Sequence, residues 1–212
     1  MTSDGGHPSD SVASDWPVAL RGVTESIVAT LGPNDRWNMA ALGLHAPDES
    51  GDPVEATTWG NTRTKRNFHR QGGGVVQFSP DPQAFVDAAV TIREEEHPVL
   101  PSADAWVDVT AESVATGTDG DTEWERWKLR PTDTGTVAAE RPHTINRGFG
   151  AVIDATVAAS RLDVPSYDTE TLLDRLAYFE ETVEKCGGPQ ERAAFEALSE
   201  ATDWRSLTGD EG

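Results

Sequence analysis

A stretch without acidic residues stands out in a chain that is otherwise rich in them. The 212 residues include 37 Asp and Glu, yet none occurs between Glu55 and Asp81. Within this stretch, segment 60–68 reads Gly-Asn-Thr-Arg-Thr-Lys-Arg-Asn-Phe, at the expected start of a helix. Hydroxyls, a guanidinium and free backbone N–H groups at a helix N-terminus are suited to holding a phosphate or another small anion. The alternative is a solvated basic helix face that balances nearby acids.

A second acid-free window, 36–47, contains Asn38-Met39-Ala40-Ala41 in the middle of an expected strand. Small side chains let a flat ring lie against the backbone, whose amide groups can then bond the heteroatoms of the ring. This window therefore favours a surface for a planar ligand.

A third acid-free window, 141–153, places Asn146-Arg147-Gly148 at the start of an expected long helix. Its polar residues could extend a ligand site. Ordinary helix packing explains the window equally well, because small residues that would allow a close helix contact recur along it. These are Gly148, Ala151, Ala155 and Ala159. Both interpretations stay open at this point.

Other residues that could do chemistry give weaker signals. Glu94-Glu95-Glu96-His97 matches no helical metal-ligand spacing and is expected to be a solvated, charged helix end. Gly72-Gly73-Gly74 lacks the Lys-Ser/Thr of a P-loop. The single cysteine, Cys186, excludes an internal disulfide, and a place near a helix C-terminus disfavours its thiolate. We therefore expect no metal site and assign no catalytic residue.

The charge balance describes the environment of the protein more than its partners. Against the 37 acids stand 17 basic residues, of which only Lys65, Lys128 and Lys185 are lysines, and the net charge is −20. Such a surface stays hydrated where salt screens repulsion, so we expect a halophilic cytoplasm. Nucleic acid is not an expected partner, because it requires a broad basic face. We expect no membrane span and no signal peptide, since no long apolar run occurs.

Apolar periodicity and turn residues predict strands in the first two thirds of the chain. The expected strands are 23–31, 36–46, 54–59, 75–79, 105–115 and 122–129. Two helices are expected between them, at 62–71 and 81–95, the second with an Asp81 cap. The residues that this second helix should bury are Phe85, Ala88, Ala89 and Ile92. Short strands joined by tight turns favour an antiparallel barrel or sandwich.

The last third of the chain has an apolar period of three to four residues, which predicts helices. The first starts near Ile145, the second follows an Asp168 cap, and a third opens at Pro189. The expected organisation has three parts: a disordered acidic tail at 1–16, a barrel at 17–137 and a helical subdomain at 138–212.

Several of these segments resemble known families. Thr62-x-Thr64-x-x-Asn67-Phe68, with a Gly-rich turn after it, resembles the phosphate loop of flavin-reductase-like split barrels, and the Asn38 strand resembles the one that supports their isoalloxazine ring. A closer resemblance is to the mostly archaeal domain-of-unknown-function 447 family, over roughly 22–195. The segments that carry it are 25–30, the Asn38 strand, 61–68, 98–101, 146–153 and 178–188. Lys65 departs from this family, where an aromatic residue is frequent, and the acidic tail is extra.

The resemblance implies an α+β fold, an antiparallel split β-barrel of the FMN-binding type followed by a C-terminal helical region. It also implies FMN in a cleft between the two barrels of a homodimer. Taken with the three windows, it gives the expected cofactor-binding residues: Asn38, Ala40, Ala41, Asn61, Thr62, Arg63, Thr64, Asn67, Asn146 and Arg147.

Three functions are compatible with such a site. The first is an oxidoreductase in which FMN takes a hydride from NAD(P)H or a small organic donor. The second is a non-enzymatic FMN-binding or electron-carrier module. The third, a haem or small-ligand binder that uses a His, is disfavoured by the phosphate loop. A fold does not decide between the first two.

Overall fold

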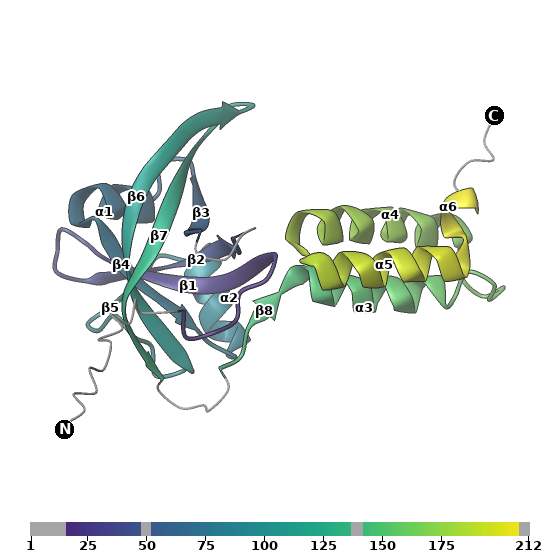
Figure 1. Ribbon diagram of the computed structural model, residues 1–212, viewed down its shortest axis with the longest axis horizontal. Coiled ribbons are helices and arrows are strands. Elements are labelled where there is room, and N and C mark those ends of the chain that lie inside the picture. The colour runs from purple at the N-terminus through teal and green to yellow at the C-terminus, as the bar shows by residue number, and fades with distance from the viewer. Residues whose placement is uncertain (1–15, 48–51, 137–141, 208–212) are drawn as a thin grey trace, which may run out of the picture.

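The computed structural model describes residues 16–47, 52–136 and 142–207 (Figure 1). Of the expected acidic tail at 1–16, only Trp16 lies within these residues. The strands are β1 Val23–Leu31, β2 Trp37–His45, β3 Val54–Trp59, β4 Gly73–Phe78, β5 Arg93–Glu95, β6 Ala105–Asp119, β7 Thr122–Thr136 and β8 Ile145–Asn146. The helices are α1 Arg63–Gln71, α2 Pro82–Val90, α3 Arg147–Ala159, α4 Thr169–Cys186, α5 Pro189–Thr202 and α6 Trp204–Leu207.

Antiparallel strands close into a barrel. Neighbouring strands run in the order β2-β3-β7-β6-β4-β1, and the pairing of β1 with β2 closes the ring. The short strands β5 and β8 pair with β2 and β1. Helices α3 to α5 lie beside the barrel and parallel to one another in Figure 1. The predicted fold, a split barrel followed by a C-terminal helical region, is therefore confirmed.

A buried apolar cluster fills the barrel and holds α1 in place. It includes Val28, Leu44 and Val76, and Phe68 of α1 enters it edge-on to Trp127, with 5.1 Å between the ring centroids. Gly72 ends α1 in the left-handed conformation, at a φ of 72°, as the predicted glycine stop requires. The helix thus packs through Phe68 while its first turn stays at the barrel surface.

Helix α2 is shorter than predicted. It ends at Val90, and residues Arg93–Glu95 form β5 on the edge of β2 instead of extending the helix. Ala84 and Ala88 are its buried residues, whereas the predicted Ile92 is 74 % exposed. The acidic segment is therefore a strand and not a helix end, because pairing with Trp37–Met39 supplies backbone hydrogen bonds that local sequence does not reveal.

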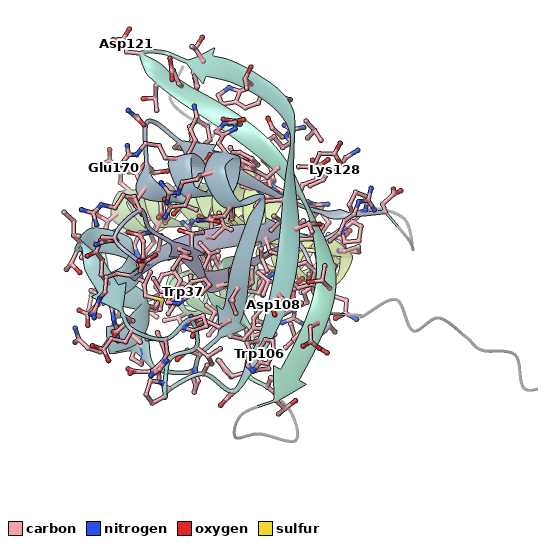
Figure 2. All side chains as sticks on the ribbon, turned by 90° about the vertical axis from the view of Figure 1, so that its left-hand side faces the viewer. Trp37, Trp106, Asp108, Asp121, Lys128 and Glu170 are labelled. Atoms are coloured by element: carbon pink, nitrogen blue, oxygen red, sulfur yellow. The ribbon has the colours of Figure 1, made fainter. Side chains whose placement is uncertain are left out.

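The hairpin of β6 and β7 is longer than predicted on both sides. The strands extend to Asp119 and Thr136, and the turn lies at Gly120, whose φ is 56°. Its tip, marked by Asp121 in Figure 2, projects beyond the barrel. The outer residues of the hairpin are mostly polar and exposed, so apolar alternation could not reveal their strand pairing.

The helical region has its own apolar cluster. Ala151, Ala155 and Ala158 of α3 pack with Leu172 and Leu176 of α4. The small-residue stripe predicted on α3 is therefore buried within the chain and is not free for a contact between subunits. The predicted caps of the later helices are confirmed: the Asp168 carboxylate accepts from the Thr171 N–H at 3.0 Å. No helix in the described ranges is long and apolar enough to cross a membrane.

Candidate functional site

A cleft of about 420 Å³ opens where β2, β3, the start of α1 and the end of α2 meet. Six of the ten residues predicted to bind a cofactor line it: Asn38, Ala40, Ala41, Thr62, Arg63 and Thr64. Its other walls are Met39, Leu42, Thr57, Thr58, Trp59, Ala88, Ala89, Thr91 and Ile92. We call this the α1 cleft. The acid-free windows at 36–47 and 60–68, which are separate in sequence, thus share one site.

The first turn of α1 presents free donors to this cleft. Thr62 caps the helix by accepting from the Lys65 N–H at 3.2 Å. The N–H groups of Arg63 and Thr64 donate to no residue that the structure describes. No acidic residue lies in the first turn to neutralise the positive end of the helix dipole. An anion is the group that these donors accommodate best.

Two buried polar side chains in the α1 cleft lack a partner. The Asn38 side chain is buried, at 6 % exposed, and so is the Thr64 side chain, at 4 %. Neither makes a side-chain hydrogen bond within the described residues, whereas every other buried polar side chain there has one. Buried polar groups are nearly always paired, so these two side chains are the ones in the cleft whose bonding a ligand could complete.

Arg63 has a partner that the sequence did not suggest. Its guanidinium forms an ion pair with Glu94 of β5 at 2.5 Å, and Glu94 also accepts from the Asn34 amide at 3.2 Å. Both Arg63 and Glu94 are partly exposed. Arg63 therefore stands between a carboxylate and the free end of α1, and a bound anion would share it with Glu94 or take it over.

The rim of the α1 cleft is apolar and open to solvent. Trp59 is 51 % exposed and Ile92 is 74 % exposed, and both line the cleft. Neither was a predicted site residue. Trp59 could have been found, since it directly precedes the loop into α1, whereas Ile92 was hidden by the expectation that α2 continues.

Asn61 and Asn67 hold α1 and do not line the cleft. Asn61 accepts from Arg66, by both its carbonyl and its side chain at 2.9 Å. The buried Asn67 amide donates to the Thr30 hydroxyl at 2.9 Å, and its oxygen accepts from Arg70 at 2.6 Å. Arg70 also donates to the Leu31 carbonyl at 2.7 Å, so it ties α1 to the barrel.

A buried carboxylate of β7 anchors α1 to the barrel. Glu125 of β7 accepts from the Ser113 hydroxyl at 2.5 Å and contacts His69 Nε2 at 3.0 Å and Lys65 Nζ at 3.5 Å. Burial alone would raise the pKa of Glu125, but the hydrogen bonds from Ser113 and His69 and the charge of Lys65 outweigh it and lower the pKa. The ionised carboxylate therefore anchors the outer face of α1.

Asn146 and Arg147 lie elsewhere, at the joint between the barrel and the helices. The Asn146 amide donates to the carbonyls of Arg21 at 2.8 Å, Cys186 at 3.2 Å and Val23 at 3.3 Å. Its oxygen caps α3 by accepting from the Phe149 N–H at 2.9 Å. The Asn146 side chain is thus bonded within the chain. Of the two interpretations of the window 141–153, a ligand site or helix packing, the packing interpretation describes its place in this chain.

Arg147 is exposed beside Asn146 and faces Glu25 rather than the α1 cleft. Partial burial raises the pKa of Glu25, and the charge of Arg147 opposes that rise. Arg147 thus compensates a strand carboxylate at the same joint.

Two family models match the chain. The N-terminal domain model of a protein of unknown function, DUF447, matches residues 24–138, and its C-terminal counterpart matches 146–200. An FMN-bound protein of this family from Methanosarcina mazei is 26 % identical, with a TM-score of 0.48, over 86 % of this chain and 96 % of that one.

Two further solved structures are similar at lower identity. The styrene monooxygenase flavin reductase of Pseudomonas putida S12 is 15 % identical over 58 % of this chain and 84 % of its own, with a TM-score of 0.39. Component B of nitrilotriacetate monooxygenase from Bacillus cereus is 14 % identical over 70 % of this chain and 89 % of its own, with a TM-score of 0.43.

Proposed function

The chain belongs to the DUF447 family, and from that premise and the α1 cleft we propose that it is a flavoprotein that binds FMN and works as an oxidoreductase. The FMN-bound family member from Methanosarcina mazei supports the choice of flavin. The observation that carries the proposal is the pair of unpartnered buried side chains, Asn38 of β2 and Thr64 of α1, which line the same cleft.

The residues divide into a phosphate end and a ring end. At the start of α1, the Thr64 hydroxyl and the free N–H groups of Arg63 and Thr64 donate to the phosphate, and Arg63 adds its charge. On β2, the Asn38 amide serves the heteroatoms of the ring, while Ala40 and Ala41 leave room for a flat group against the strand. The donor set therefore fits a planar ring carrying one phosphate.

The flavin, when bound, supplies hydride and electron transfer. The described residues of the α1 cleft include no His, Cys, Asp, Glu, Lys or Tyr, so this chain contributes no evident acid or base from its walls. Trp59 and Ile92 give the site an apolar rim. The donor we propose is NAD(P)H or a small organic molecule. The same lack of titratable walls fits a flavin-binding electron carrier, which is the alternative.

The apolar rim leads us to propose a homodimer with FMN at the subunit interface. Trp59, Val90 and Ile92 are half exposed or more around the α1 cleft, and a second copy would cover them. Sedimentation at high salt should give about twice the 22.8 kDa of one chain. A monomer that binds FMN tightly would contradict this part of the proposal.

The net charge of −20 leads us to propose a salt-rich cytoplasm, and the stability of the protein should then increase with KCl concentration.

Flavin content and reduction test the function. Protein purified from cells should be yellow and should release FMN, not FAD or riboflavin, on denaturation. Arg63→Ala should weaken FMN binding by about 1.5–3 kcal/mol, the range for a charge-assisted hydrogen bond, and leave riboflavin binding unchanged. Arg66→Ala is the matched control, because Arg66 belongs to the same helix but does not line the α1 cleft. It should change the affinity for neither FMN nor riboflavin.

Anaerobic mixing with NADH or NADPH separates the enzyme from the carrier. Saturable bleaching of the flavin by one of them supports the oxidoreductase. Reduction by dithionite but by neither nucleotide nor any small organic donor favours the carrier. A colourless protein that takes up no added FMN rejects both.

A further inference from the structure

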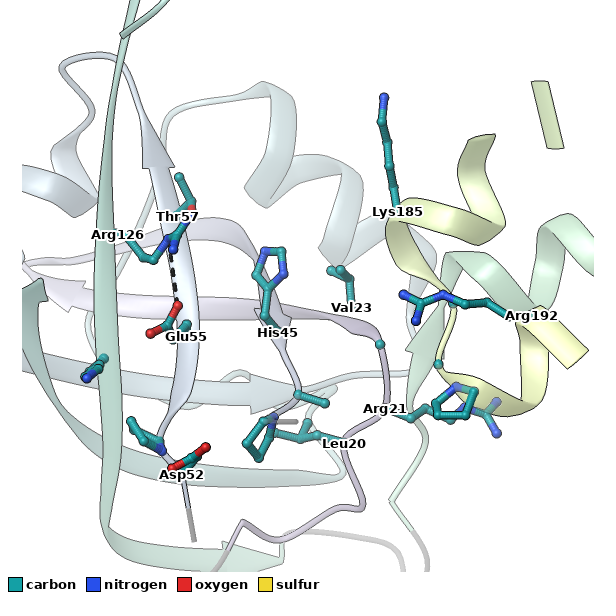
Figure 3. A pocket seen from close by; sticks show the side chains of 18 residues that line it. Leu20, Arg21, Val23, His45, Asp52, Glu55, Thr57, Arg126, Lys185 and Arg192 are labelled. Atoms are coloured by element: carbon teal, nitrogen blue, oxygen red, sulfur yellow. Dashed lines mark ion pairs between the residues drawn. The ribbon is translucent and has the colours of Figure 1, made fainter. Parts of the chain in front are cut away.

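A second, larger cleft lies at the joint between the barrel and the helices (Figure 3). Its volume is about 700 Å³, within the range of small-molecule sites. The barrel contributes the end of β2, strand β3 and the middle of β7, and the helices contribute the connection between α4 and α5. We call it the junction cleft. Thr57 of β3 lines both this cleft and the α1 cleft, so the two adjoin on one strand.

The junction cleft gathers positive charge in a strongly acidic protein. Five of the 17 Lys and Arg of the chain line it, but only two of the 37 Asp and Glu, Asp52 and Glu55. The five cations are Arg21, Arg126, Lys128, Lys185 and Arg192. Two of the only three lysines are among them. The local balance is thus opposite in sign to the net charge of −20.

Three of these cations are already paired with carboxylates. Arg21 contacts the buried Glu191 at 3.2 Å, and Arg126 lies 3.7 Å from Glu55. Lys185 pairs with Glu181, one helical turn away on the exposed side of α4. The Arg126–Glu55 pair is marked in Figure 3 on the barrel wall of the cleft.

Lys128 and Arg192 have no carboxylate partner. The Lys128 side chain makes no hydrogen bond or ion pair within the described residues, and Arg192 donates only to the Glu184 carbonyl, at 3.1 Å. Lys128 comes from the barrel and Arg192 from the helices. In Figure 3, Arg192 reaches from α5 toward the barrel, with His45 between it and Arg126.

Partial burial and the charge of Arg126 lower the pKa of His45, so the imidazole is neutral near pH 7 and can both donate and accept.

Two unpaired cations on facing walls are unusual in a chain with so many acids to pair them. A ligand with several negative charges could contact both walls at once and supply the counter-charge that neither side chain has within ion-pair distance. The flexible Lys suits an anion as a point charge, and the Arg fork suits a phosphate or carboxylate face. In the strand register Lys128 lies between Glu55 of β3 and Glu112 of β6, yet it forms an ion pair with neither, and both Lys128 and Arg192 line the cleft.

We propose that the junction cleft binds the anionic part of the redox substrate, a small molecule that carries two or more phosphate or carboxylate charges, and that Lys128 and Arg192 hold it from opposite walls. The substrate assignment rests on the proposed flavin function. The anion site itself does not, since its residues belong to a different cleft.

The test uses the FMN-loaded full chain, so that the start of α1 is occupied, with inorganic pyrophosphate and citrate as probes. Calorimetric titration at constant ionic strength should show one probe bound per chain. The double variant Lys128→Gln/Arg192→Gln should weaken binding at least tenfold. The control Arg161→Gln/Arg175→Gln removes the same charge outside the cleft, from arginines that stack on Tyr167 and Phe179, and should change the affinity less than twofold. Stronger binding of pyrophosphate would indicate a phosphorylated substrate, and stronger binding of citrate a polycarboxylate.

Two results would overturn the proposal: neither probe binds, or the double variant binds as the wild type does. The flavin spectrum provides a separate readout, because the clefts share Thr57. Saturating probe should shift the visible absorption of the wild type but not of the double variant, and a bound probe without any shift would reject the substrate role. If the chain takes up no FMN, the same titration on the flavin-free Thr64→Val variant still tests the anion site, and only the flavin function fails.

Discussion

Two helix N-termini of this protein look alike in sequence and differ in use. Both α1 and α3 begin after a strand, at Asn61-Thr62-Arg63 and Asn146-Arg147-Gly148, without acids in the first turn. At α1 the donors and the Thr64 hydroxyl are free and face a cleft. At α3 the Asn146 side chain is bonded four times within the chain. A candidate ligand site is thus distinguished from a structural joint by polar groups that have no hydrogen-bond partner within the chain, more than by residue type.

The largest expected effect is at the joint. Asn146→Ala removes the cap of α3 and the amide N–H groups that the carbonyls of Arg21, Cys186 and Val23 share, so it should lower the free energy of unfolding by about 2–4 kcal/mol. Denaturant unfolding measures this. Asn61→Ala, at an exposed position just before the α1 cap Thr62, should cost less than about 0.5 kcal/mol. An Asn146→Ala protein of full stability that has lost FMN would instead make Asn146 a ligand.

The anchoring of α1 should depend on ionised Glu125. Glu125→Gln should cost about 2 kcal/mol at pH 7, because the bonds from Ser113, His69 and Lys65 lose their charged partner. The lowered pKa gives stability that is present above the unfolded value near 4.5 and is lost as pH falls through the folded value. Unfolding curves below pH 4.5 should therefore converge for wild type and variant. A constant difference over that range would exclude the carboxylate charge as the cause.

Two glycines of α3 provide a matched pair for the packing of the joint. A Cβ on Gly148 would lie 2.5 Å from the Gly187 Cα, whereas a Cβ on Gly150 would have open space. Gly148→Ala should therefore destabilise by about 1–2 kcal/mol despite the gain in helix propensity. Gly150→Ala should be neutral or stabilising. Equal melting temperatures for the two variants would contradict the close contact.

The smallest expected effect concerns Glu94, which competes with an anion for Arg63. Glu94→Gln should tighten FMN binding by about 1 kcal/mol and leave riboflavin unchanged, because it frees the guanidinium and removes a like charge near the phosphate. Flavin fluorescence titration measures both ligands. Weaker FMN binding in the variant would show that Glu94 orients Arg63 instead of competing with it.

Local signals were enough to predict much of the fold and six of the fifteen residues that line the α1 cleft. Turn glycines, the Asp168 cap and apolar alternation are properties of neighbouring residues, and they predicted most strands and the helix starts. Pairings distant in sequence were not accessible in this way. Glu94 meets Arg63 across 31 residues, and Asn146 meets Arg21 across 125. The predicted end of α2 was wrong for the same reason, because β5 gains its hydrogen bonds from β2.

The resemblance to split-barrel flavoproteins added the order of the segments, but it did not separate ligands from supports. Asn67 and Asn146 carry the motif and are bonded inside the chain. Thr64 and Asn38 also belong to the motif, but their side chains make no hydrogen bond within the described residues. Only the three-dimensional bonding of each side chain makes that distinction.

The central claim is that Thr64 faces the phosphate and Asn38 faces the ring, and one set of titrations tests it directly. Dissociation constants of FMN and riboflavin are measured for wild type, Thr64→Val and Asn38→Ala at matched high salt, because lower salt could unfold so acidic a protein. Thr64→Val should weaken FMN about tenfold or more without affecting riboflavin, and without loss of stability, since its hydroxyl has no partner in the chain. Asn38→Ala should weaken both flavins in the same proportion. Equal losses of FMN and riboflavin in Thr64→Val would contradict the account and remove the phosphate from the start of α1.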